Sequence, residues 1–129
     1  MATTSTKNPT SSELEILHVL WERGPSTVRE VHLALSEKRP IGYTSVLKLM
    51  QIMTTKGTVR RNETQRAHVY EAVQPAEKTK RDLAMDVLQR VFDGSASELM
   101  MHALAGRKAS KEEIDEMRRL LNEHERKIR

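Results

Sequence analysis

Four polar side chains share one face of a predicted helix near the middle of the chain. When Ile41–Lys56 is placed on a helix at about 100° per residue, hydroxyl, amide and ammonium groups fall together: Thr44, Lys48, Gln51 and Thr55. Such groups hydrogen-bond to base edges and phosphate oxygens. No acid occurs between Arg39 and Asn62, whereas an ordinary solvent-exposed face usually mixes glutamate with lysine. This pattern favours a DNA-recognition helix, and the alternative is the solvated face of a core helix.

Positive charge is concentrated around this helix. From Lys38 to Arg66 the chain has seven Lys or Arg against one acid, so the segment carries +6 and the remainder −2 of the net charge of +4. Concentrated positive charge favours a polyanionic partner. Arg60, Arg61 and Arg66 follow the helix, and we expect them to reach phosphates or the minor groove. The alternative is a charged sheet edge that prevents aggregation.

Short helices must position the polar face. Ser12–Glu15 fits a capping box, and apolar residues at helical spacing follow it up to Gly24-Pro25. Thr27–Glu30 repeats the capping pattern and begins a second helix, which Pro40 ends. The third helix is the recognition helix, and its apolar stripe is formed by Val46, Leu49, Met50 and Met53.

The periodicity changes after Gly57. We predict strands at Thr58–Arg61 and Arg66–Val73, joined by a polar turn at 62–65. A hairpin directly after a recognition helix is typical of a winged helix. The predicted fold is therefore mainly α with a small β-hairpin, with a winged helix-turn-helix domain over residues 11–74. The expected DNA contacts are Thr27, Tyr43, Thr44, Ser45, Lys48, Gln51, Arg60, Arg61 and Arg66.

Gln74-Pro75 marks the boundary to a helical second domain, predicted over residues 75–129. Beyond Pro75 the chain has 54 residues, with 12 Lys or Arg and 11 Asp or Glu, in three short predicted helices. Such a segment makes a poor core by itself, so we expect it to form a homodimer. The alternative is packing on its own winged helix. The expected dimerisation residues are Leu83, Val87, Val91, Phe92, Leu99, Met100, Ile114, Met117 and Leu121.

Other chemistry has little support in the sequence. The chain has no cysteine, which excludes disulfides and thiolate metal sites. Its histidines show neither HxxxH nor HExxH spacing, and no phosphate-binding glycine motif or paired nucleophile and base occurs. We therefore predict no enzyme activity, no cofactor and no metal. Residues 1–10 are expected to be a disordered tail and not a signal peptide. No apolar run is long enough for membrane insertion, so we expect a cytoplasmic protein.

Several segments in this order resemble the penicillinase-repressor family of the BlaI/MecI/CopY type. The motifs are Leu14-Glu15-Ile16-Leu17, Thr27-Val28-Arg29-Glu30-Val31-His32, Tyr43-Thr44-Ser45-Val46-Leu47, Lys56-Gly57, Arg66-Ala67-His68-Val69-Tyr70 and Val91-Phe92-Asp93-Gly94-Ser95. The resemblance extends from about Ser12 to Glu123. It implies a homodimeric winged-helix repressor that binds a double-stranded DNA operator, an inverted repeat with TACA/TGTA-like half-sites.

The resemblance also implies how such a repressor is released. In the β-lactam-responsive members a membrane sensor-protease triggers cleavage in the dimerisation region, at an Asn-Phe dipeptide. The aligned dipeptide here is His102-Ala103, and we expect the segment from Gly94 to Ser110 to be accessible to proteases. The copper-responsive members bind metal through a cysteine motif, which this chain lacks. Many members of the family carry arginine where this chain has Ile52, so we expect one phosphate contact of the family to be absent here. The alternative functions are a winged-helix protein–protein adaptor and a DNA-binding regulator with a different inducing signal.

Overall fold

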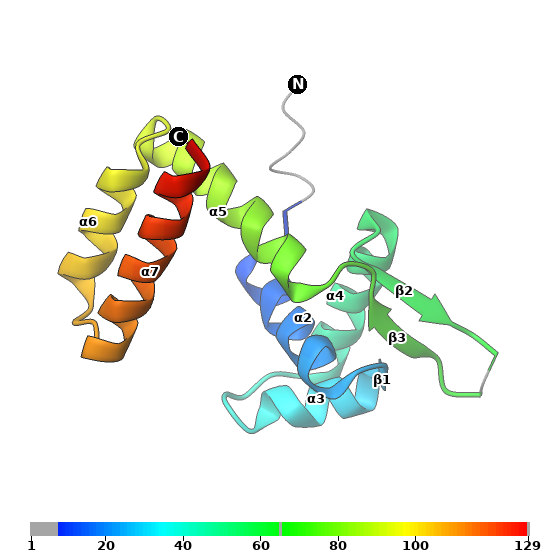
Figure 1. Cartoon of the computed structure of the whole chain (residues 1–129). Coiled ribbons are helices and arrows are strands. Elements are labelled where there is room, and N and C mark those ends of the chain that lie inside the picture. Colours follow the sequence, from blue (N-terminus) through cyan, green and yellow to red (C-terminus); the bar gives the residue numbers. More distant parts are fainter. Residues whose placement is uncertain (1–7, 65, 129) are drawn as a thin grey trace. The chain divides into compact units, whose positions relative to one another are not determined.

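The computed structural model of the chain describes residues 8–64 and 66–128 (Figure 1). Its elements are α2 (Ser11–Arg23), β1 (Ser26–Thr27), α3 (Val28–Ser36), α4 (Tyr43–Lys56), β2 (Val59–Asn62), β3 (Val69–Ala72), α5 (Ala76–Phe92), α6 (Ala96–Gly106) and α7 (Lys111–Ile128). The predicted fold class, mainly helical with a small antiparallel sheet, is confirmed. The chain divides within α5 into two compact units, one ending at Asp86 and the other beginning at Val87.

The N-cap of helix α2 is Thr10, two residues before the predicted cap. The amide of Glu13 donates to Thr10 Oγ1 at 3.2 Å, and the amide of Thr10 donates to Glu13 Oε1 at 3.1 Å. The prediction of Ser12 and Glu15 as the capping pair is therefore wrong. With Thr10 as the N-cap, Glu13 is also buried, and its Oε1 accepts a hydrogen bond from Lys56 Nζ at 2.8 Å. This ion pair joins the start of α2 to the end of α4.

The expected disordered tail does not extend through residue 10. Residues 1–7 lie outside the described part of the chain, but Thr10 is the N-cap of α2 and the carbonyl of Asn8 accepts from Lys56 Nζ at 3.4 Å. The predicted capping box of α3 is confirmed, because the amide of Glu30 donates to Thr27 Oγ1 at 3.2 Å and the carboxylate accepts in return at 2.9 Å.

Helices α2, α3 and α4 pack against the sheet around one core (Figure 1). The predicted apolar stripe of α4 is confirmed: Val46, Met50 and Met53 are fully buried, and Leu49 packs at the core's edge. The other buried apolar residues are Ile16, Leu17, Val19, Leu20, Val28, Val31, Leu35, Val59 and Tyr70. Gly57 ends α4 with φ 87°, a left-handed conformation that favours glycine.

The sheet has three strands in the order β1-β3-β2, all antiparallel. Strand β1 was not predicted, because two residues show no periodicity. It pairs Ser26 with Tyr70 along the edge of β3. Strand β2 has the predicted length but lies one residue further along the chain, β3 is shorter than predicted, and Arg66 lies in the loop between them. The register places Arg60 opposite Glu71 and Arg61 opposite Tyr70.

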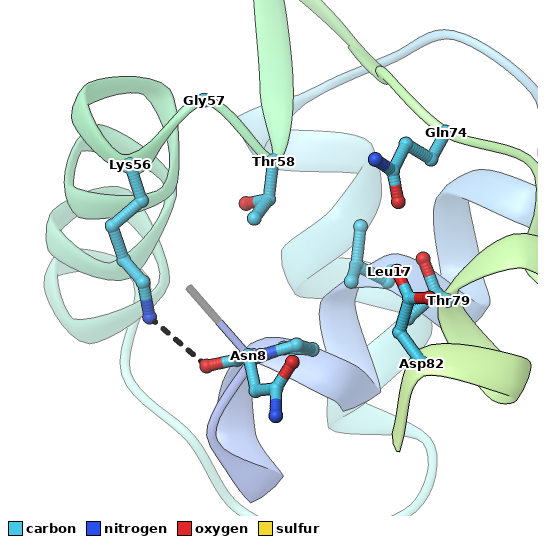
Figure 2. A pocket seen from close by; sticks show the side chains of 9 residues that line it. Asn8, Leu17, Lys56, Gly57, Thr58, Gln74, Thr79 and Asp82 are labelled. Atoms are coloured by element: carbon cyan, nitrogen blue, oxygen red, sulfur yellow. Dashed lines mark hydrogen bonds between the residues drawn. The ribbon is translucent and has the colours of Figure 1, made fainter. Parts of the chain in front are cut away.

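The beginning of α5 belongs to the winged-helix unit. The indole N–H of Trp21 donates to the Gln74 carbonyl at 3.0 Å, and Thr79 is buried. These contacts explain why the unit extends to Asp86 and not only to the expected boundary at 74. A cavity of about 180 Å³ lies beside Thr79, and Figure 2 shows the side chains around it. It is lined by Asn8, Pro9, Leu17, Lys56, Gly57, Thr58, Gln74, Thr79 and Asp82.

The second unit contains the end of α5 together with α6 and α7. Asp93 and Gly94 adopt left-handed conformations that end α5, and the Gly94 amide donates to the Leu88 carbonyl at 2.9 Å. Ser95 then caps α6 by accepting from the Glu98 amide at 3.2 Å. Among the described residues of this unit, none has a buried side chain. None of the described helices is long and apolar enough to cross a membrane.

Candidate nucleic-acid interface

The outer face of α4 carries the predicted polar residues, and all of them are exposed. Tyr43, the first residue of the helix, is 46% exposed. The exposed polar residues that follow it on this face are Thr44, Ser45, Lys48, Gln51 and Thr55. Lys48 has no hydrogen-bond or ion-pair partner among the described residues, so its ammonium is available to a ligand. Because the opposite side of α4 is fixed in the core, the helix presents this face without further rearrangement.

The first turn of α4 is suited to an anion. Its N-cap is Gly42, no side chain caps the turn, and no acid occurs in it. The first amides of a helix lack carbonyl partners within the helix and carry its positive dipole end. A phosphate can therefore bind at the backbone amides that precede Val46, next to the exposed hydroxyls of Thr44 and Ser45.

The hairpin arginines are held by acids of the hairpin itself. Arg60 Nε lies 2.9 Å from Glu71 Oε2, and Arg61 Nε lies 2.6 Å from Glu63 Oε2. Hydrogen bonds to Tyr70 and Glu63 raise the pKa of Arg61. Because successive side chains of a strand point to opposite faces, Arg60 and Arg61 leave β2 on different sides of the sheet. Both arginines therefore cannot contact the same phosphate from one side of the sheet.

Much of the local charge of +6 is also balanced from outside the segment. Arg39 Nη2 lies 2.7 Å from Glu15 Oε1 of α2, and this hydrogen bond is the main reason why the pKa of Glu15 is lowered. Lys56 is paired with the buried Glu13. Arg66, in the hairpin loop, is exposed and without a hydrogen-bond or ion-pair partner among the described residues. The cations left for a polyanion therefore include Lys48 and Arg66.

The arrangement of a three-helix core, an acid-free helix face and an arginine-bearing hairpin agrees with the comparison to known proteins. The sequence matches the penicillinase repressor family over residues 9–123. The chain belongs to this family. It is 34% identical over 115 residues to the transcriptional regulator BlaI of Mycobacterium tuberculosis, in strains CDC 1551 and H37Rv, with 88% of this chain and 82% of the relative covered. The resemblance drawn from the spaced motifs is thus confirmed, and membership places the chain among transcriptional repressors.

Thr27 has a structural role in this family member. It ends β1 and caps α3, and its half-buried hydroxyl accepts from the Glu30 amide. The hydroxyl proton is still available for a phosphate oxygen, so its predicted DNA contact stays a prediction.

Most of the predicted dimerisation residues lie in the second unit with their apolar side chains partly or largely exposed. The exposed fraction is 60% for Val91 and 54% for Leu121. Met100 of α6 lines the same surface hollows as Met117 and Leu121 of α7. Leu83 differs from the rest of the set, because it precedes Asp86 and belongs to the winged-helix unit.

The candidate cleavage dipeptide is helical. His102 and Ala103 are exposed residues in the middle of α6, and the His102 ring lies 5.7 Å from the ring of Phe92. The segment from Gly94 to Ser110 was expected to be easily reached by a protease, but most of it is helix. The longest irregular connection in this segment is formed by residues 107–110, between α6 and α7.

Sequence reasoning missed the acids that hold the hairpin arginines. Glu71 directly faces Arg60 in the antiparallel register, so a correct register would have revealed the pair. Arg61 and Glu63 are only two residues apart in the sequence, so their spacing at the polar turn could have predicted this ion pair.

Proposed function

We propose that this family member is a homodimeric, sequence-specific DNA-binding repressor that acts in the cytoplasm on an inverted-repeat operator with TACA/TGTA-like half-sites. The observation that carries the proposal is the exposed, acid-free face of α4. A surface helix with no DNA partner gains solubility from mixed charges, whereas an acid on this face would repel phosphates. The face instead offers one unpaired cation, Lys48, among hydroxyl and amide groups.

Two kinds of contact follow from this placement. Thr44 and Ser45 on the first turn of α4 can lie against thymine methyl groups, and Lys48 one turn later can donate to guanine O6 and N7. Arg66 on the hairpin loop is the unpaired cation suited to a phosphate. Arg60 and Arg61 reach phosphates only by exchanging their carboxylate partners for them.

The second unit supports a homodimer. Three helical segments without one buried side chain among the described residues do not form a stable core by themselves. Their apolar residues need a covering surface, and a second copy supplies the same apolar residues in return. Two linked winged helices then engage two half-sites at once, which raises affinity far above that of one copy.

Release by proteolysis is part of the proposal, with a membrane sensor-protease system as the upstream partner implied by the family resemblance. A cut between His102 and Ala103 separates α7 from α5 and so removes Ile114 and Leu121 from the dimer. A protease binds its substrate in extended form, so α6 must first unwind locally at this point. Limited proteolysis of the DNA-bound protein, with fragments identified by mass, tests whether loss of operator binding accompanies a cut between residues 94 and 110. A chain that is cut there and still holds the operator as a dimer contradicts this part.

The central experiment is DNA binding by the full chain. A duplex from the protein's own upstream region that contains the inverted repeat is compared with the same duplex with the half-sites scrambled, in gel shifts with competitor DNA. We expect one shifted band with the stoichiometry of two chains per duplex. Lys48→Ala should relax the preference, whereas Lys80→Ala, which removes an exposed lysine of α5, should not. Equal binding of both duplexes by the wild type contradicts the proposal.

A further inference from the structure

His32 of α3 reaches across the turn that leads to α4. Its Nε2 lies 2.8 Å from the carbonyl oxygen of Ile41. A carbonyl can only accept, so Nε2 carries the proton and donates. Ile41 is half-buried against the core and is the last residue before the N-cap Gly42. The hydrogen bond therefore ties α3 to the entry of α4.

The same imidazole contacts the first residue of α4. The ring centroids of His32 and Tyr43 are 5.7 Å apart at an angle of 82° between the ring planes, an edge-to-face arrangement that is favourable for aromatic pairs. Tyr43 is nevertheless 46% exposed. The ring of Tyr43 is thus oriented by His32, and its exposed surface is open to a ligand.

The entry of α4 has little local support of its own. Helices α2 and α3 begin with reciprocal capping boxes, whereas α4 begins at Gly42 without a side-chain cap. Its first backbone bond, from the Val46 amide to the Gly42 carbonyl, measures 3.2 Å. An uncapped first turn frays more readily than a capped one. The contacts of His32 therefore replace a local cap with one from the neighbouring helix.

We propose that His32 is a positioning residue for base recognition, which holds the first turn of α4 and the Tyr43 ring in the geometry that reads the operator. This inference rests on the proposed DNA-binding function. Thr44 and Ser45 follow directly, so a shift of this turn moves the groups that face the bases. Phosphate contacts supply most of the non-specific affinity, and the unpaired Arg66 lies on a different element. Loss of His32 should accordingly reduce discrimination between sequences more than overall DNA affinity.

Two substitutions separate the hydrogen bond from the ring contact in the full-length protein. His32→Phe keeps a ring against Tyr43 but has no donor for the Ile41 carbonyl. His32→Gln keeps an N–H donor at similar reach but has no ring. A third variant, His32→Asn, has a donor that is too short to reach and serves as a polar substitute for His32→Phe should that variant fold poorly.

The readouts are the dissociation constants for the operator and scrambled duplexes, and hydrogen–deuterium exchange of residues 42–46 without DNA. For His32→Phe and His32→Asn we expect about tenfold weaker operator binding, the product of about a threefold loss at each half-site. Binding to the scrambled duplex should weaken by a smaller factor, because there only the phosphate contact at the first turn of α4 is affected, and exchange in this turn should be faster. His32→Gln should remain within about threefold of the wild type for the operator.

Two results overturn the inference. One is an unchanged ratio of the two dissociation constants together with unchanged exchange in His32→Phe and His32→Asn. The other is an equal loss for both duplexes that accompanies a lower melting temperature, which indicates a general structural role. A wild type that does not prefer the operator refutes the proposed function instead, and the exchange of residues 42–46 then decides alone whether His32 holds the entry of α4.

Discussion

The ion pair between Arg60 and Glu71 makes a sharp prediction about DNA affinity. These residues face each other on β2 and β3, with Nε and Oε2 2.9 Å apart. If Arg60 contacts a phosphate, that phosphate must displace the carboxylate of Glu71. Glu71→Gln keeps the size of the side chain but removes its charge, so Arg60 is released in advance. The substitution should therefore strengthen binding to operator and scrambled DNA alike.

The expected gain follows from the exposure of the pair. The side chains of Arg60 and Glu71 are 61% and 43% exposed, and ion pairs of this kind contribute about 0.2–1 kcal/mol. A dimer has two such pairs, so the gain is about 0.4–2 kcal/mol, or roughly two- to thirtyfold in the dissociation constant. If the wild type leaves Arg60 bound to Glu71 in the complex, the variant adds about one phosphate contact per chain and steepens the salt dependence accordingly.

Fluorescence anisotropy with a labelled duplex, repeated over a series of salt concentrations, measures both quantities. Asp82→Asn is the matched control, because Asp82 forms a pair of similar exposure with Lys78, 2.9 Å apart, on α5 and not on the hairpin. It changes the net charge by the same amount. An affinity and a salt slope for Glu71→Gln that equal those of Asp82→Asn would remove Arg60 from the phosphate contacts. Weaker binding by Glu71→Gln would show that Glu71 holds Arg60 in its binding geometry and would refute the competition argument.

Three further predictions concern the helix face, the units and pH. Lys48→Ala should cost about 1–3 kcal/mol of operator binding and relax the sequence preference in selection from random duplexes. A chain that ends at Asp86 should sediment as a folded monomer with much weaker operator binding, whereas one that ends at Pro75 loses the buried Thr79 and should melt at a lower temperature. Arg39 holds the pKa of Glu15 below its ordinary value of 4.5, so the pair stabilises the fold above that range and is lost as the pH falls through the lowered pKa. Urea unfolding from about pH 6 to about pH 3 should show a shallower loss of stability in Glu15→Gln.

Helical periodicity predicted the scaffold of the interface well because it records burial directly. Val46, Met50 and Met53 recur at helical spacing, and all three are fully buried. The same spacing places the polar residues of α4 on the exposed side. Strand β1 shows the limit of this approach, since Ser26 and Thr27 are too few to show a period, and they form a strand only because β3 has an open edge beside them.

The cap of α2 could not be settled by local pattern. Thr10–Glu13 and Ser12–Glu15 both fit the spacing of a capping box. With Thr10 as the cap, Glu13 is buried against Lys56 of α4. With Ser12 as the cap, Lys56 would lose this carboxylate partner. A contact between residues far apart in the sequence thus selects between two locally equivalent starts of the helix.

Charge is the property for which sequence and structure differ most, and the difference bears on function. The +6 of the basic segment is a sum over neighbours in sequence, whereas folding brings Glu13 and Glu15 from α2 and Glu71 from β3 against its cations. An arginine already paired with a carboxylate gains less from an arbitrary phosphate, so these pairs lower the non-specific affinity that dominates at any DNA sequence. Lys48, on the face that meets the bases, has no such competitor among the described residues. We therefore expect the intramolecular ion pairs to weaken binding to operator and other DNA by about the same factor, so that non-specific complexes of this repressor dissociate at a salt concentration at which the operator complex persists.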